Sequence, residues 1–100
     1  MTPVLVFRRS ARADIAKAFN WYEERRTGLG DAFLLEVQSC LKYVLDRPKG
    51  FPRIHGEFRQ ALLHRFPYVM VYRPKGKTIV IMRVFHCSQD PSKKIPRKRI

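Results

Sequence analysis

Four arginines and one histidine stand where they could bind or act on an anion. Guanidinium groups suit phosphate because their forked donors match its oxygens, and imidazole titrates near neutral pH. The candidate catalytic residues are Arg65, Arg83 and His86, and no further catalytic residue is assigned. The candidate residues for binding a target or partner are Arg59, Arg65, Arg73, Arg83, Lys93 and Lys94.

Arg83 is unusual because the stretch around it, residues 78–86, is otherwise almost continuously apolar. Burying an unpaired charge is costly, so two arrangements are open. Either Arg83 faces an open side of the sheet, where it would bind an anion, or it pairs with a carboxylate. The carboxylates considered are Asp14, Glu36 and Asp90.

For several other polar and aromatic residues, a structural role and a functional role are both open. His86 either caps the turn after its strand or serves as a general acid or base. Cys87 adjoins it, but neighbouring strand residues face opposite sides, so we expect no nucleophilic dyad. Tyr68 and Tyr72 share a strand face, where they either stack on bases or pack the sheet. Cys40 lies on an apolar helix stripe and is expected in the core.

Two consecutive helices are predicted to precede most of the strands. Helical spacing of apolar residues predicts a first helix that Ser10 caps and that runs to about Arg26. Gly28 is the expected left-handed break. A second helix, capped by Asp31, should end at Arg47 because Pro48 follows. The short link makes an antiparallel hairpin.

Strand patterns occupy both ends of this helical pair. Val4–Phe7 favours a short strand, and three more are predicted at Phe58–Phe66, Tyr68–Arg73 and Thr78–His86, the last in a central position. Pro74–Lys77 supplies the final turn. The order β-α-α-β-β-β predicts an α+β domain, with the helical hairpin on one face of a mainly antiparallel sheet and the other face free for a ligand.

Length and charge set further limits. One hundred residues suit one domain, here 1–91, with a basic tail at 92–100. Residues 1–46 carry a net charge of +1 and residues 47–100 a net of +12. Such segregation predicts a polyanionic partner, the alternative being a charge that serves solubility. We expect a cytoplasmic protein, since no signal peptide or membrane span is evident, and no metal or cofactor, since the usual motifs are absent.

A set of short motifs, in this order and spacing, resembles the RelE/ParE superfamily of bacterial type II toxin–antitoxin (plasmid stabilisation) toxins over residues 4–91. The motifs are Asp14-Ile15, Ala18, Trp21-Tyr22-Glu23, Gly28-Leu29-Gly30, Phe33, Pro48, Pro52, Arg59, Arg65-Phe66-Pro67-Tyr68, Tyr72, and His86 through Asp90-Pro91. The resemblance implies a cognate antitoxin that wraps the toxin. The basic C-terminal half predicts that the antitoxin's binding segment is acidic.

The superfamily holds ribosome-dependent mRNA endonucleases, which are RelE-like, and ParE-like poisons of DNA gyrase. Val69 and Gln89 stand where RelE-like nucleases typically have arginine, and Gln60 and Leu62 where they have lysine. The resemblance therefore favours the ParE-like branch, with gyrase as target. Gln89 also replaces the arginine of that branch's His-x-x-Arg-Asp-Pro ending, which predicts weakened activity. A RelE-like nuclease with a variant site, and an inactive relic that only binds its antitoxin, are the alternatives.

Overall fold

The computed structural model describes residues 3–88, so the predictions made for Gln89, Lys93, Lys94 and the tail lie outside the described residues. The elements in chain order are β1 (Val4–Phe7), α1 (Arg9–Arg25), α2 (Leu29–Asp46), β2 (Arg53–His55), β3 (Phe58–Leu62), β4 (Tyr68–Lys75) and β5 (Thr78–His86). Within residues 3–88, neither helix combines the length and apolar character that a bilayer crossing needs.

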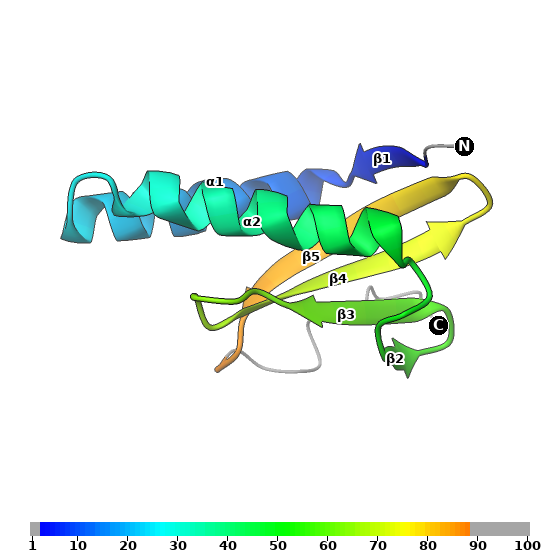
Figure 1. The fold of residues 1–100 in the computed structure, drawn as a ribbon. Helices are drawn as coiled ribbons and strands as arrows, with labels where there is room; N and C mark the ends of the chain where they lie inside the picture. The colour runs from blue at the N-terminus through cyan, green and yellow to red at the C-terminus, as the bar shows by residue number, and fades with distance from the viewer. Residues whose placement is uncertain (1–2, 89–100) are drawn as a thin grey trace.

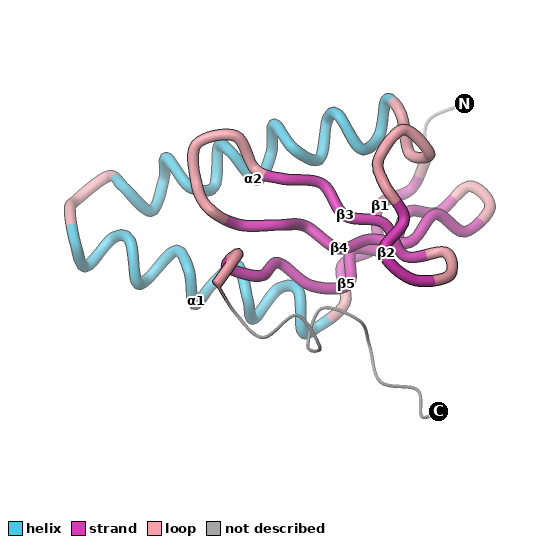
Figure 2. The backbone as a smooth tube through the Cα atoms, turned by 90° about the horizontal axis from the view of Figure 1, so that it is seen from below, coloured by secondary structure: helices cyan, strands magenta, loops and turns pink. Residues whose placement is uncertain are grey.

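The two helices form one layer and the sheet forms the other. In Figure 1, α1 and α2 run antiparallel to each other along one face of the strands. The sheet order is β1-β5-β4-β3-β2, with β1 parallel to β5 and the other neighbours antiparallel. Figure 2 shows the same strands from the side that the helices leave open. The predicted α+β class and the helical hairpin are confirmed. β5 lies inside the sheet, between β1 and β4, but the middle strand is β4.

The link between the helices is held by glycines and by Glu23. Gly28 has a φ of 91°, the left-handed conformation that was predicted for it. Gly30 lets the helices approach closely, since a Cβ there would lie 2.7 Å from the Phe19 ring. The Glu23 carboxylate accepts from Gly28 N at 3.0 Å and from Gly30 N at 2.9 Å. This α1 side chain therefore caps the first turn of α2.

Both predicted capping residues were wrong. Asp31 lies inside the first turn of α2, where its charge favours the helix dipole but makes no cap hydrogen bond. Ser10 lies within α1, which begins after Arg8 without a side-chain cap. The Ser10 hydroxyl instead donates to the Met82 carbonyl at 2.9 Å. The Ser10 hydroxyl therefore bonds to a distant strand, whereas the local sequence pattern had predicted that it would cap the start of α1.

The strand predicted at residues 58–66 was too long, and β2 was missed. β3 ends at Leu62, and residues 63–67 turn back so that Phe66 enters the core, 4.9 Å from the Tyr22 ring and 5.4 Å from the Phe33 ring between centroids. β2 pairs with β3 through a tight turn at Gly56, whose φ is 53°. Arg65 is consequently not a strand residue.

The main core lies between the helices and the sheet. Tyr72 is fully buried there, and its hydroxyl donates to the Pro48 carbonyl at 2.6 Å. Burial raises the pKa of Tyr72 to about 12 and that of Cys40 to about 11, so both stay neutral at physiological pH. Tyr72 therefore packs against the sheet rather than stacking on bases, and Cys40 lies in the core as expected. The opposite sheet face carries a smaller apolar cluster of Phe58, Val71 and Met82.

Candidate functional site

Arg59 is engaged by the loop that follows α2. Its Nη1 donates to the Phe51 carbonyl at 2.7 Å and to the Lys49 carbonyl at 3.2 Å. Backbone carbonyls in a loop need donors, and a guanidinium can serve two at once. Arg59 therefore holds the loop against the start of β3, a role that its position in the sequence did not reveal.

Arg65 and Arg73 lie near opposite ends of β4. Arg65 precedes the strand in the bend at residues 63–67, and its backbone N–H donates to Glu36 Oε1 at 3.3 Å. Arg73 is near the other end, with its guanidinium carbon 5.8 Å from the centre of the Phe58 ring. Phe58 belongs to the cluster on the sheet face away from the helices. These two candidates therefore do not converge on one ligand position.

Arg83 is paired with Asp14, one of the three carboxylates considered. Its Nε and Nη2 donate to the two carboxylate oxygens at 2.7 and 2.9 Å. This hydrogen-bonded contact raises the pKa of Arg83. The guanidinium also lies 4.2 Å from the centre of the Phe85 ring. Such a two-point pair fixes the orientation of Arg83.

The pair forms where β1 stops short of the end of β5. The last residue of β1, Phe7, pairs with Ile81, so β5 continues beyond with an uncovered edge. Two side chains from the first half of α1 form hydrogen bonds with that edge. Ser10 donates to the Met82 carbonyl, and Asp14 accepts from Val84 N at 2.9 Å. The ladder register also shifts at Met82, and such shifts re-aim neighbouring side chains. Asp14 therefore accepts hydrogen bonds from the β5 backbone, at Val84 N, and from the Arg83 side chain of the same strand.

His86 has a structural role in the turn after β5. Ser88 N donates to its Nδ1 at 3.0 Å, and the Ser88 hydroxyl lies 2.8 Å from the same atom. Its ring lies 5.2 Å from that of Tyr68. Because Nδ1 accepts a backbone hydrogen bond, the neutral ring carries its proton on Nε2. The hydrogen bond from Ser88 N supports the interpretation that His86 caps the turn after its strand.

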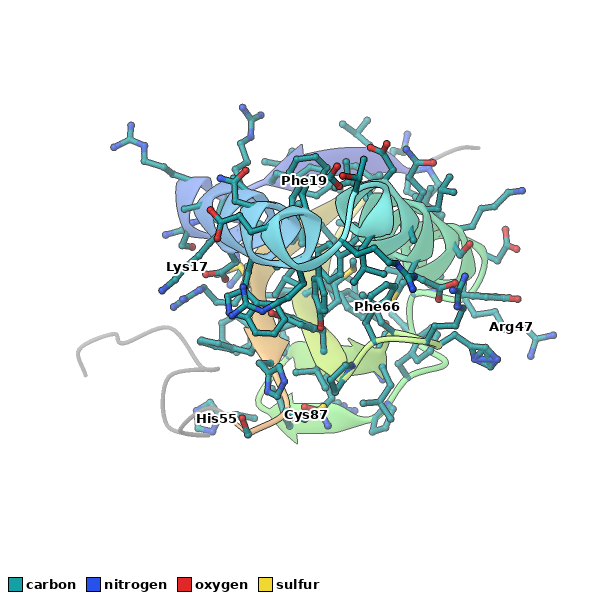
Figure 3. The ribbon with its side chains drawn as sticks, turned by 90° about the vertical axis from the view of Figure 1, so that its left-hand side faces the viewer. Lys17, Phe19, Arg47, His55, Phe66 and Cys87 are labelled. Atoms are coloured by element: carbon teal, nitrogen blue, oxygen red, sulfur yellow. The ribbon has the colours of Figure 1, made fainter. Side chains whose placement is uncertain are left out.

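A hollow of about 520 Å³ opens between α1 and the ends of β4 and β5. We call it the Trp21 hollow; its lining residues are Asp14, Lys17, Ala18, Trp21, Tyr22, Tyr68, Arg83, Val84, Phe85, His86 and Ser88. Burial raises the pKa of Tyr22 and that of Tyr68, so both phenols keep their protons. Figure 3, seen from the hairpin end, shows Lys17 on the flank of α1 and Cys87 at the end of β5 below it.

The hollow brings together only part of the predicted site. Arg83 and His86 both line it, and Arg65 does not. Lys17 and Trp21 were not among the candidates. Their signal was present in the sequence, because Asp14, Lys17 and Trp21 recur at intervals of three and four and so share one face of a helix. The pattern is visible only once that face is known to meet β5.

Two of the three candidate catalytic residues have structural partners. Cleavage needs a base, an acid and cations around one phosphate. Arg83 is held by Asp14, and the Nδ1 of His86 is held by Ser88. Across residues 3–88, no group of three or more histidine, cysteine or acidic side chains is placed to hold a metal ion.

The architecture, one helical hairpin over a five-stranded mixed sheet, is that of the RelE/ParE superfamily of toxins. Within it, this chain belongs to the ParE toxin family: the family model described as ParE toxin of type II toxin-antitoxin system, parDE, matches residues 5–91.

Two solved structures are similar to this chain. The chromosomal ParDE toxin–antitoxin system from Pseudomonas aeruginosa superposes with a TM-score of 0.64 at 25% identity, covering 85% of this chain and 96% of that one. The toxin–antitoxin complex RelBE2 from Mycobacterium tuberculosis gives 0.61 at 20% identity, covering 86% and 99%, and shows the shared fold alone. None of the curated proteins matches the chain.

Proposed function

We propose that this chain is the toxin of a type II toxin–antitoxin pair, that it acts in the cytoplasm by inhibiting DNA gyrase, and that a cognate antitoxin neutralises it. The observation that carries the proposal is the match of the ParE toxin family model to residues 5–91. The similar structures are described as toxin–antitoxin systems or complexes, which supports a cognate antitoxin here.

The charge of the chain supports an acidic antitoxin segment. The sheet layer and its loops, residues 47–88, carry nine lysines and arginines against one glutamate. Complementary charge raises the rate of encounter and disfavours wrong partners. Arg59, Arg65, Arg73 and Arg83, together with Lys93 and Lys94 of the tail, remain the residues proposed to bind either the target or the antitoxin.

The nuclease alternative has weaker support. It would use Arg65, Arg83 and His86 as a variant site, but Arg65 does not line the hollow that holds the other two. Two donors of Arg83 bind Asp14, which fixes the orientation of its guanidinium toward that carboxylate. An inactive chain that only binds an antitoxin is the third possibility, and the experiment below separates all three.

The decisive experiment is controlled expression of the chain with and without its antitoxin. We expect growth arrest, an SOS response and intact mRNA, and loss of supercoiling by purified gyrase when the purified chain is added. Co-expression of the antitoxin should restore growth. Cleaved mRNA with intact DNA would refute gyrase as the target, and unimpaired growth would indicate an inactive chain.

A further inference from the structure

The Trp21 hollow combines aromatic walls with cations. Five of its lining residues carry aromatic rings: Trp21, Tyr22, Tyr68, Phe85 and His86. Trp21 keeps 49% of its surface exposed, which is unusual for so large an apolar side chain. Arg25 lies over this ring, its guanidinium carbon 3.6 Å from the centroid. An exposed indole backed by a cation is a stacking surface for a flat ligand.

The cations of the hollow still have donors to offer. Arg83 uses its Nε and one Nη2 position on Asp14, and a guanidinium has five N–H groups in all, so about three remain. Its side chain is 29% exposed, so those donors are accessible. Lys17 lies one turn beyond Asp14 on α1, and no carboxylate is paired with it among the described contacts. The hollow therefore presents positive charge beside its aromatic walls.

We propose that the Trp21 hollow binds one nucleotide of a single-stranded nucleic acid. The base packs against Trp21 and Tyr68, and the phosphate contacts Lys17 and Arg83. Aromatic platforms beside a basic groove are the usual means of holding single strands without reading their sequence. At about 520 Å³ the hollow falls within the range of roughly 300–1,000 Å³ typical of ligand pockets. The proposal does not depend on gyrase being the target.

An acidic peptide is the competing occupant, and the observations favour it less. A carboxylate would need the cations alone, which leaves the exposed Trp21 ring without a function. Cations occur over the whole sheet layer, whereas at this hollow they adjoin the half-exposed Trp21 ring and the Tyr68 ring. Base stacking uses the rings and the cations together.

The chain's single tryptophan gives a direct measurement. Because Trp21 lines the hollow, a stacked base should quench its fluorescence. We would titrate the full chain with a short oligothymidylate, with an abasic deoxyribose-phosphate oligomer of equal length, and with oligoglutamate. The expected result is saturable quenching by oligothymidylate, with weaker binding and little quenching by the abasic oligomer.

Charge reversal in the hollow supplies the matched control. Lys17→Glu should weaken oligothymidylate binding about tenfold, since it turns an attraction for phosphate into a repulsion. Lys42→Glu makes the same charge change on the exposed surface of α2, outside the hollow, and should have a much smaller effect. Circular dichroism checks that both variants fold, and Lys17→Gln serves in place of Lys17→Glu if that variant does not.

Three results would overturn the proposal. Equal losses in the Lys17 and Lys42 variants would mean that binding follows net charge alone. Equal binding and quenching by the abasic oligomer would mean that no base enters the hollow. Saturable quenching by oligoglutamate alone would assign the hollow to an acidic protein segment. Each result is independent of whether the chain inhibits gyrase.

Discussion

At the scale of single residues, the Asp14–Arg83 pair explains why a charge lies in an apolar strand. Two hydrogen bonds join the side chains, and Asp14 also accepts from Val84 N. We expect Arg83→Ala and Asp14→Ala each to lower the free energy of unfolding by about 1–3 kcal/mol, because each leaves partly buried groups unpaired. Chemical denaturation of both variants measures this directly.

The double variant tests whether the two effects share one origin. If the pair is structural, the loss in the Asp14→Ala, Arg83→Ala double variant should fall well short of the sum of the single losses. Arg12→Ala, which removes an exposed arginine of the same helix, should change stability little. Additive losses would mean that each side chain acts through other contacts.

Whether the contacts of a single residue could be predicted from the sequence depended on the kind of group that contacts it. Asp14 could be named among three possible partners of Arg83, because a charge in an apolar strand either faces an open side of the sheet or pairs with an opposite charge. The partners of Arg59 could not be predicted, because they are backbone carbonyls of a loop and carry no sequence signal. Lys17 was missed because its significance comes only from the packing of α1 beside β5.

At the scale of elements, the helical hairpin depends on a cap that crosses between its helices. Glu23 of α1 accepts from Gly28 N and Gly30 N at the start of α2. We expect Glu23→Ala to lower the free energy of unfolding by about 1 kcal/mol, the usual cost of losing a helix cap. Glu24→Ala removes an exposed carboxylate from the next position and is the matched control. Equal stabilities in thermal denaturation would show that the cap contributes nothing.

The sequence predicted which helices and strands exist better than it predicted where they end. β5 was predicted at its observed bounds because a long apolar run between turn residues leaves little ambiguity. β3 was extended too far because no glycine or proline interrupts residues 58–66, although the chain turns back at residues 63–67. β2 was missed because three residues show no periodicity. Gly56-Glu57 was its only local signal, a glycine-led two-residue hairpin turn.

At the scale of the whole molecule, the uneven charge along the chain becomes a difference between layers. Residues 3–46 form both helices and β1 and carry a net charge of +1, whereas residues 47–88 form the rest of the sheet and carry +8. The split in the sequence thus corresponds to two sides of the fold (Figure 1). The sheet layer is the side that should attract an acidic partner.

This arrangement predicts how salt and charge should affect antitoxin binding. Exposed charges steer association and are screened within a Debye length of about 10 Å at 0.1 M salt, so the association rate should fall roughly tenfold from low to physiological salt. Stopped-flow mixing measures it. Replacing Arg53 and Lys75 of the sheet layer with Gln should slow association more than replacing Arg12 and Lys42 of the helical layer, although both changes remove two exposed charges. Equal slowing would mean that total charge, and not its side of the molecule, guides the partner.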